Sequence, residues 1–190
     1  MSKIKKTLIL LILFSNLSCT KDTDQIAIEE SSIISIMVDE MTVNLALAYE
    51  LGDKENENRD LDTLENLKTT IFVDPIMKKL DHKLVLPNQF QELQDLVDNI
   101  NRLPEKKINQ NSIISNDKIK IFFDANLKNF KGKYPQILFF SPIAFNKELK
   151  TAILFAGNKL GKLQSYTNFY ILKKNHNKWE IVYTQSEEIS

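Results

Sequence analysis

Ile137-Leu-Phe-Phe-Ser-Pro-Ile-Ala-Phe145 and Ala152-Ile-Leu-Phe-Ala156 are two apolar segments separated by a short polar connection. Both are apolar at successive positions, which is typical of strands that are buried on both faces of a sheet. Segments 166–172 and 179–183 continue the series. Because the connections between the four segments are short and turn-rich, the sequence predicts an antiparallel meander.

Large apolar or aromatic side chains occupy every second position of the last segment. Trp179, Ile181 and Tyr183 are expected on one face of the strand, with Glu180 and Val182 on the other. This period of two residues predicts that one face of the final strand packs on the core.

Two more strands are predicted upstream, at 69–73 and 119–123, where β-branched and aromatic residues concentrate. Segment 43–47 alternates apolar and small or polar residues, and this favours a short strand over a continued helix. The acid-rich segment 53–62 lacks the central Gly and closing Glu of a calcium-binding loop, so an exposed loop is expected there.

Two helices are predicted. Ser31 and Ser32 offer an N-cap before an apolar set at helical spacing that runs to Met41. Asn88 is expected to cap a second helix that ends before Pro104, with these residues on its apolar face: Phe90, Leu93, Leu96, Val97 and Ile100. The fold class is therefore α+β, an antiparallel sheet of four to six strands with two main helices covering one face.

The chain opens with three lysines and then the apolar run 8–14, the charged-then-apolar plan of an export signal. The run is shorter than the roughly 20 apolar residues that a bilayer span needs. A buried helix or strand is the alternative, but the basic flank and terminal position favour a signal peptide over residues 1–18.

Ser15-Asn16-Leu17-Ser18-Cys19 places a small residue directly before the single cysteine of the chain. It resembles a lipobox, the motif at which lipoprotein signal peptidase cuts, with Asn16 standing where an aliphatic residue is usual. The resemblance implies lipidation of Cys19, whereas a free thiol or an intermolecular disulfide is the alternative use of a lone cysteine.

Thr20-Lys21-Asp22 follows the cysteine and resembles the Cys-x-Lys-acidic signal of some Gram-negative lipoproteins. It implies the outer membrane and display on the cell surface, with a periplasm-facing position or a simple solvated tether as the alternatives. Residues 19–30 are accordingly expected to be the lipidated cysteine and a flexible tether, and 31–190 a single globular domain.

Charge is distributed unevenly along the chain. Residues 19–117 contain 20 acids and 10 bases, while residues 118–178 contain 12 lysines against Asp124 and Glu148. Six lysines in or beside the sheet connections are candidate contacts to an anionic partner: Lys147, Lys150, Lys159, Lys162, Lys173 and Lys174. The simpler interpretation is that these lysines keep the sheet soluble and protect its edges.

No set of residues specifies catalysis. His82 and His176 both lie in charged or turn-rich stretches, and nothing in their spacing pairs either one with Ser141. Gly157 to Lys162 departs from a phosphate-binding loop in glycine spacing and in the residue after the lysine. We therefore expect no catalytic residue, no metal, no cofactor and no nucleic-acid partner.

The C-terminal part also resembles a widespread group of bacterial secreted proteins and lipoproteins to which no activity is assigned. The resemblance covers 130–183 and is carried by Tyr134-Pro135, Phe140 to Asn146, Thr151-Ala152, Gly157, Gly161, Phe169 to Lys174 and Lys178 to Ile181. These are strand and turn positions. The expectation is a lipid-anchored envelope protein with a non-enzymatic binding or accessory role, whose partner is a protein or an anionic surface polymer, and the alternative is an extracytoplasmic hydrolase.

Overall fold

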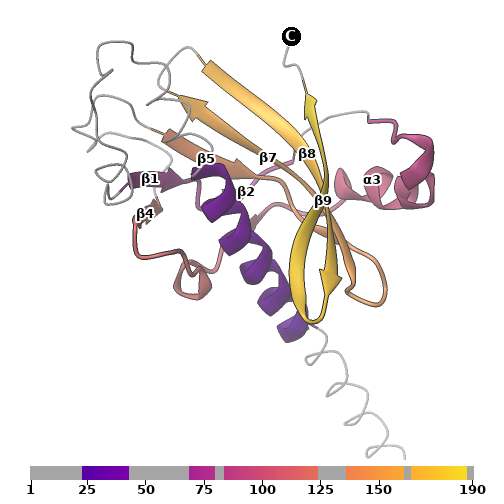
Figure 1. Cartoon of the computed structure of the whole chain (residues 1–190), viewed down its shortest axis with the longest axis horizontal. Helices are drawn as coiled ribbons and strands as arrows, with labels where there is room; N and C mark the ends of the chain where they lie inside the picture. The colour runs from indigo at the N-terminus through magenta and orange to yellow at the C-terminus, as the bar shows by residue number, and fades with distance from the viewer. Residues whose placement is uncertain (1–22, 43–68, 80–83, 124–135, 161–163, 188–190) are drawn as a thin grey trace, which may run out of the picture.

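A mixed sheet of seven strands forms the centre of the computed structural model, which describes residues 23–42, 69–79, 84–123, 136–160 and 164–187 (Figure 1). The strand order is β4-β1-β5-β7-β8-β9, and β6 pairs with β7 beside β5. The strands are β1 Thr69–Val73, β4 Ile119–Phe123, β5 Gln136–Phe140, β6 Ala144–Phe145, β7 Thr151–Leu160, β8 Gln164–Asn175 and β9 Lys178–Glu187. The α+β class is confirmed.

The antiparallel meander of β5, β7, β8 and β9 is as predicted, but the sheet is larger and mixed. Strand β1 pairs in parallel with β4 on one side and with β5 on the other. A parallel pair requires a long crossover, and the chain between β1 and β4 supplies one that includes a helix. The predicted topology rested on the short connections alone, so it did not include the parallel pairing of β1 with β4 and β5.

Strand β9 contains a bulge that divides its side chains between both faces of the sheet. The register shifts so that Ile171 pairs with Tyr183 while Leu172 pairs with Ile181. Trp179 and Ile181 thus pack in one core and Tyr183 in the other. The prediction that Trp179, Ile181 and Tyr183 share a face is wrong, because the extra residue reverses the alternation.

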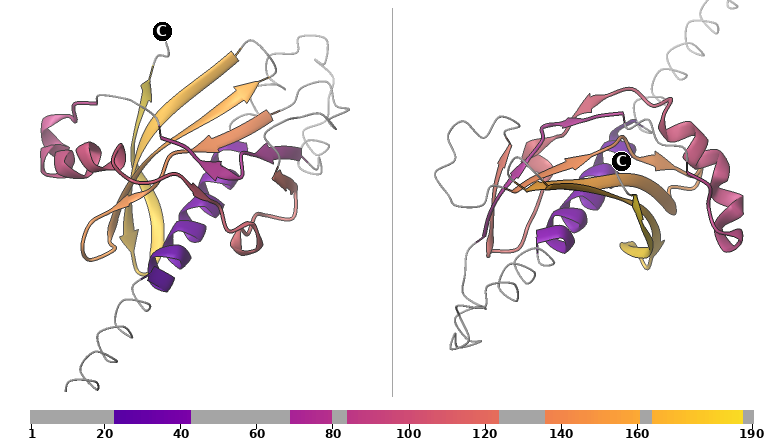
Figure 2. Two further views of the ribbon diagram at one scale, coloured as in Figure 1. Left: turned by 180° about the vertical axis from the view of Figure 1, so that it is seen from behind. Right: turned by 90° about the horizontal axis from the view of Figure 1, so that it is seen from above.

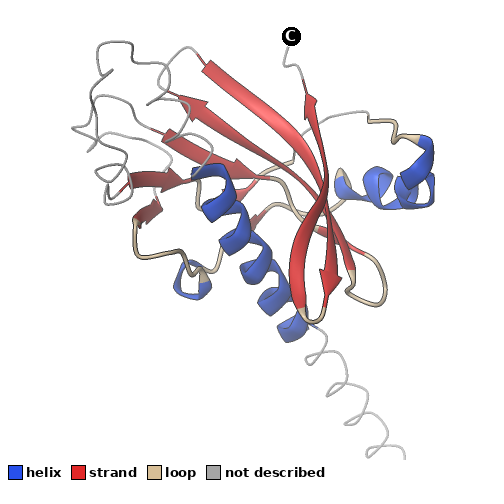
Figure 3. Cartoon of the chain, viewed as in Figure 1, coloured by secondary structure: helices blue, strands red, loops and turns tan. Residues whose placement is uncertain are grey.

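A long helix over residues 23–42 crosses one face of the sheet, as Figures 1 and 3 show. Its apolar stripe packs on the sheet through Ile33, Ile34, Met37, Val38 and Met41. The helix includes residues 23–30, which were expected to belong to a flexible tether. Ser31 and Ser32 therefore lie inside the helix and do not cap it.

The second predicted helix forms as two pieces on the opposite face of the sheet. A 3-10 helix, η2 (Asn88–Leu93), is kinked at Phe90 and leads into α3 (Gln94–Ile100). Pro87, not Asn88, occupies the cap position, and no side chain caps the start. Leu93, Val97 and Ile100 are buried there as predicted.

The two helical layers therefore enclose the sheet, in contrast to the expected arrangement on one face. Successive residues of β7 alternate between the cores, with Leu154 under the long helix and Phe155 under α3. In the views of Figure 2 the long helix and α3 lie apart on the sheet. A small sheet of β2 (Ile76–Met77) and β3 (Lys106–Lys107) and the 3-10 turn η3 (Gln110–Ser112) complete the described chain.

Several predicted features lie outside the described residues: the signal segment with Cys19, the segments 43–47 and 53–62, His82 and Lys162. Within the described part of the chain, no helix combines the length and apolar character that a membrane crossing requires.

Candidate functional site

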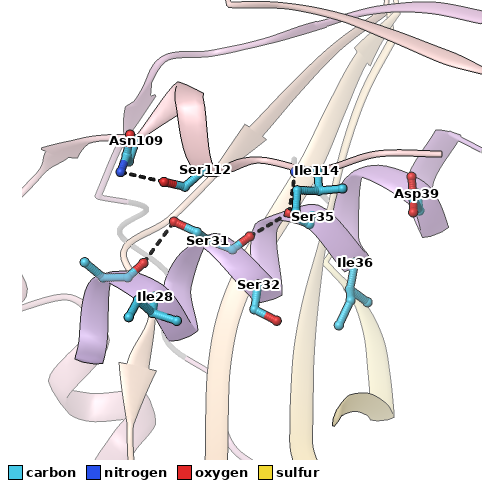
Figure 4. Close-up of a pocket in the computed structure, with 10 residues that line it drawn as sticks. Ile28, Ser31, Ser32, Ser35, Ile36, Asp39, Asn109, Ser112 and Ile114 are labelled. Carbon is cyan, nitrogen blue, oxygen red and sulfur yellow. Dashed lines mark hydrogen bonds between the residues drawn. The ribbon is translucent and has the colours of Figure 1, made fainter. Parts of the chain in front are cut away.

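A pocket of about 450 Å³ lies between the long helix and the segment that follows β3 (Figure 4). We call it the serine pocket. Its lining residues come from one side of the helix and from η3 with its flanking residues: Ala27, Ile28, Ser31, Ser32, Ser35, Ile36, Asp39, Asn109, Ser112 and Ile114.

Hydrogen bonds fix the floor of the serine pocket. Ser31 Oγ donates to Ala27 O at 2.9 Å, and Ser35 Oγ donates to Ser31 O at 2.8 Å. Ser35 Oγ also accepts the backbone N–H of Ile114 at 2.9 Å, which holds the outer segment on the helix. These hydroxyls therefore serve the structure of the pocket.

The rim of the serine pocket is apolar and open to solvent. Ile28 is 67% exposed and Ile114 is 76% exposed. Asp39 is the ionisable side chain of the lining, and its Oδ1 accepts two hydrogen bonds from Asn116. A site of this kind accommodates apolar groups beside a few polar contacts, a composition typical of binding sites.

A buried ion pair fastens the long helix to the β8–β9 hairpin. The carboxylate of Glu29, only 7% exposed, accepts a hydrogen bond from Lys174 Nζ at 2.5 Å and one from Trp179 Nε1 at 2.8 Å. Lys174 Nζ also lies 5.6 Å from the centre of the Trp179 ring, within the range of a cation–π contact. We call these three residues the Glu29 clasp.

The next helical residue makes a second attachment of the same type. Glu30 Oε1 accepts a hydrogen bond from Lys106 Nζ in β3. The carboxylates of Glu29 and Glu30 thus bind the β8–β9 hairpin and β3, two elements that are far apart in the sequence. A buried carboxylate without such partners would be strongly destabilising.

The structure divides the six predicted lysine contacts into separate groups. Lys147 and Lys150 lie in the β6–β7 connection, and Lys173 pairs with Thr151 at the same end of the sheet. Lys159 lies near the other end of β7, opposite Ile137. Lys174 is part of the Glu29 clasp, and Lys162 is outside the described residues. The five described lysines therefore do not all lie at one end of the sheet.

Ser141 and His176 occupy structural positions. Ser141 is buried between β5 and β6, where its Oγ accepts the backbone N–H of Phe155 at 2.9 Å and donates to Pro142 O at 2.8 Å. His176 has a φ of 45° and Asn177 a φ of 64° in the exposed β8–β9 turn. Two successive left-handed residues are the requirement of a type I′ hairpin turn.

We expect the variant Ser141→Ala to lose about 1–2 kcal/mol of unfolding free energy, because it removes the hydroxyl that accepts the Phe155 N–H where the strand breaks. Urea denaturation measures the change, with Ser186→Ala, at an exposed position of β9, as the control. Equal stability of the two variants would contradict this role.

Two asparagine–tyrosine pairs lie on strands β7 and β8. Asn158 is fully buried, and its Nδ2 donates to the hydroxyl of Tyr166 at 3.5 Å, while Asn168 Nδ2 donates to that of Tyr170 at 3.1 Å. Burial raises the pKa of both tyrosines above the ordinary value of 10.0, against the opposing effect of these hydrogen bonds.

These raised pKa values predict that stability decreases at high pH. The folded chain holds the tyrosine protons more tightly than the unfolded chain, so the stabilisation is full below pH 10.0 and is lost as the pH rises through the folded-state pKa values. Denaturant unfolding at pH 9 and pH 11 is expected to show a smaller decrease in the double variant Tyr166→Phe, Tyr170→Phe. An identical decrease in both proteins would contradict the prediction.

Sequence reasoning missed the serine pocket and the Glu29 clasp. The spacing of Ser31 and Ser35, one helical turn apart, was a usable signal for the pocket floor, but it requires a helix that begins before Ser31. The clasp joins residues that are 145 and 150 positions apart, and no local pattern identifies such partners.

No family model, curated protein or solved structure matches the chain significantly. The sequence and the geometry of the described residues are therefore the basis for any functional conclusion.

Proposed function

We propose that the protein is a lipoprotein of the Gram-negative outer membrane, anchored through an acylated Cys19, with a non-enzymatic binding or accessory role in the cell envelope. One observation carries the proposal: three lysines, the apolar run 8–14 and Ser18-Cys19 follow one another in the order of a lipoprotein signal.

The physics of the anchor supports stable attachment. Each buried methylene contributes about 0.8 kcal/mol, and lasting attachment requires more than one chain. Lipoproteins of this kind carry two or three acyl chains. Thr20-Lys21-Asp22 supports display on the outer surface, and a periplasm-facing position is the alternative.

The described domain supports binding over hydrolysis. Apolar clusters cover the sheet on both faces, and the serine pocket presents exposed isoleucines beside bonded hydroxyls. Ser141, the serine that a hydrolase hypothesis would use, is committed to the backbone of β7. The partner class that we propose is an envelope protein or an anionic surface polymer.

Growth of producing cells with labelled fatty acid tests the anchor. We expect the wild-type chain to incorporate label and to sediment with membranes, and the variant Cys19→Ala to do neither. Protease treatment of intact cells then tests surface display. If the domain is displayed on the surface, we expect the protease to digest it. Wild-type protein without label would refute the anchor.

A further inference from the structure

The sheet has one end at which two turns project beside the start of the long helix. We define the hairpin end as Lys147 and Lys150 of the β6–β7 connection together with Lys173 and Lys178 of the β8–β9 hairpin. We propose that the hairpin end lies against the membrane and binds anionic lipid headgroups. This inference rests on the proposed function, because the lipid on Cys19 brings the domain to the bilayer.

Backbone pairing places these lysines together. Lys174 N donates to Lys150 O at 2.8 Å, and Thr151 pairs with Lys173, so the β6–β7 connection lies beside the last residues of β8. Lys178 pairs with Asn175 across the adjacent turn. The four lysines therefore belong to two neighbouring turns at one end of the sheet.

The Glu29 clasp places the beginning of the long helix at the same end. Glu29 lies fewer than two helical turns after Thr23, and it bonds Lys174 and Trp179 next to the β8–β9 turn. Figure 1 and the left view of Figure 2 both show the first described turn of the helix beside this hairpin.

Covalent geometry limits how far this end can be from the membrane. Thr23 follows Cys19 by four residues, and an extended chain advances at most about 3.6 Å per residue, which gives about 14 Å. An acylated Cys19 lies in the headgroup layer, so the helix start lies within this distance of it. The neighbouring turns are then the part of the domain closest to the bilayer.

The charges of the hairpin end match an anionic surface. Its four lysines are exposed, and within the described part of the chain none of them is in an ion pair. The exposed acids nearby are fewer: Glu148, Glu180 and, on the helix, Asp24. Glu29 is also at this end, but its buried carboxylate is paired with Lys174. Lysines close to an anionic leaflet strengthen attachment by about fivefold each, over a range of about 10 Å.

Sedimentation with lipid vesicles tests the proposal on the mature chain, residues 19–190, carrying Cys19→Ser, which cannot be acylated. We expect it to bind vesicles of phosphatidylcholine mixed with phosphatidylglycerol, and to bind pure phosphatidylcholine vesicles much less. Replacement of the four hairpin-end lysines by Gln is expected to weaken binding to the anionic vesicles by about tenfold or more. High salt is expected to have the same effect.

A matched variant controls for net charge. Replacing Lys79, Lys107, Lys118 and Lys159 by Gln removes the same number of exposed lysines elsewhere, and it is expected to change binding less than twofold. Circular dichroism of both variants checks that each is folded. Equal weakening by the two variants, or no preference for anionic vesicles, would overturn the proposal.

Two further outcomes separate the alternatives. Lysine-dependent binding to dextran sulfate without binding to the anionic vesicles would assign the hairpin end to a surface polymer and would also overturn the proposal. If the wild-type protein incorporates labelled fatty acid but the Cys19→Ser chain does not bind anionic vesicles, the proposal that the hairpin end binds the membrane is overturned. The proposed lipid anchor is not affected by that result. If no label enters the protein, the anchor itself fails.

Discussion

Replacing Glu29 by Ala is expected to lower the free energy of unfolding by about 3 kcal/mol. The change removes the acceptor of two donors, the partly buried Lys174 Nζ and the buried Trp179 Nε1. The ammonium group of Lys174 then remains largely buried without its carboxylate, and desolvation of an uncompensated charge is the main source of the loss. Urea denaturation followed by far-UV circular dichroism measures the effect.

The variants at the clasp also separate charge from packing. Glu29→Gln keeps the shape and one acceptor oxygen, so its loss is expected to be smaller than that of Glu29→Ala. Glu92→Ala, at an exposed position of η2, is the control and is expected to change stability by no more than about 0.5 kcal/mol. If Glu29→Ala is as stable as Glu92→Ala, the clasp does not hold the helix on the sheet.

Gly157→Ala is expected to lose about 2–3 kcal/mol of unfolding free energy. Gly157 lies in the middle of the sheet opposite Phe139 and Thr167. An added Cβ would lie 2.2 Å from Phe139 Cζ and 2.5 Å from the backbone oxygen of Tyr166. Both neighbours would have to move, because the ring of Phe139 fills the space that the missing side chain leaves.

A double variant tests this explanation for Gly157. Phe139→Leu removes the ring that occupies the space, so Gly157→Ala should cost less in the Phe139→Leu background than in the wild type. The Tyr166 oxygen still opposes the new methyl group, and part of the loss should therefore remain. Additive effects in the double-mutant cycle would contradict a contact between residues 139 and 157.

The antiparallel half of the sheet was predictable because its information is local. Apolar runs such as 152–156 and the short turns between them determine the meander without reference to the rest of the chain. Strand β4 was also placed correctly at 119–123, but its parallel pairing with β1 depends on a crossover of more than 40 residues. The sequence pattern of a single strand does not identify its neighbours.

The first turns of the long helix were not predictable for a different reason. The segment from Asp24 to Glu30 has the composition of a solvated linker, and its two glutamates become buried only because Lys174 and Lys106 meet them in the fold. Tertiary contacts here override the local preference. The bulge opposite Ile171 is a similar case, because one extra residue reverses the faces that simple alternation assigned to Tyr183.

The candidate lysines were found by composition, and the fold determines which of them act together. Lys147, Lys150 and Lys173 lie at one end, Lys159 lies near the other, and Lys174 faces Glu29. The division depends on strand register, which a count of charges does not contain. Lys178 joins the group through the β8–β9 turn.

Mass spectrometry of the intact protein, purified from membranes in detergent, tests the anchored state most directly. We expect a chain that begins at Cys19 and carries a diacylglycerol on the sulfur. A purified chain that still contains residues 1–18, or one that begins elsewhere with an unmodified Cys19, would contradict it.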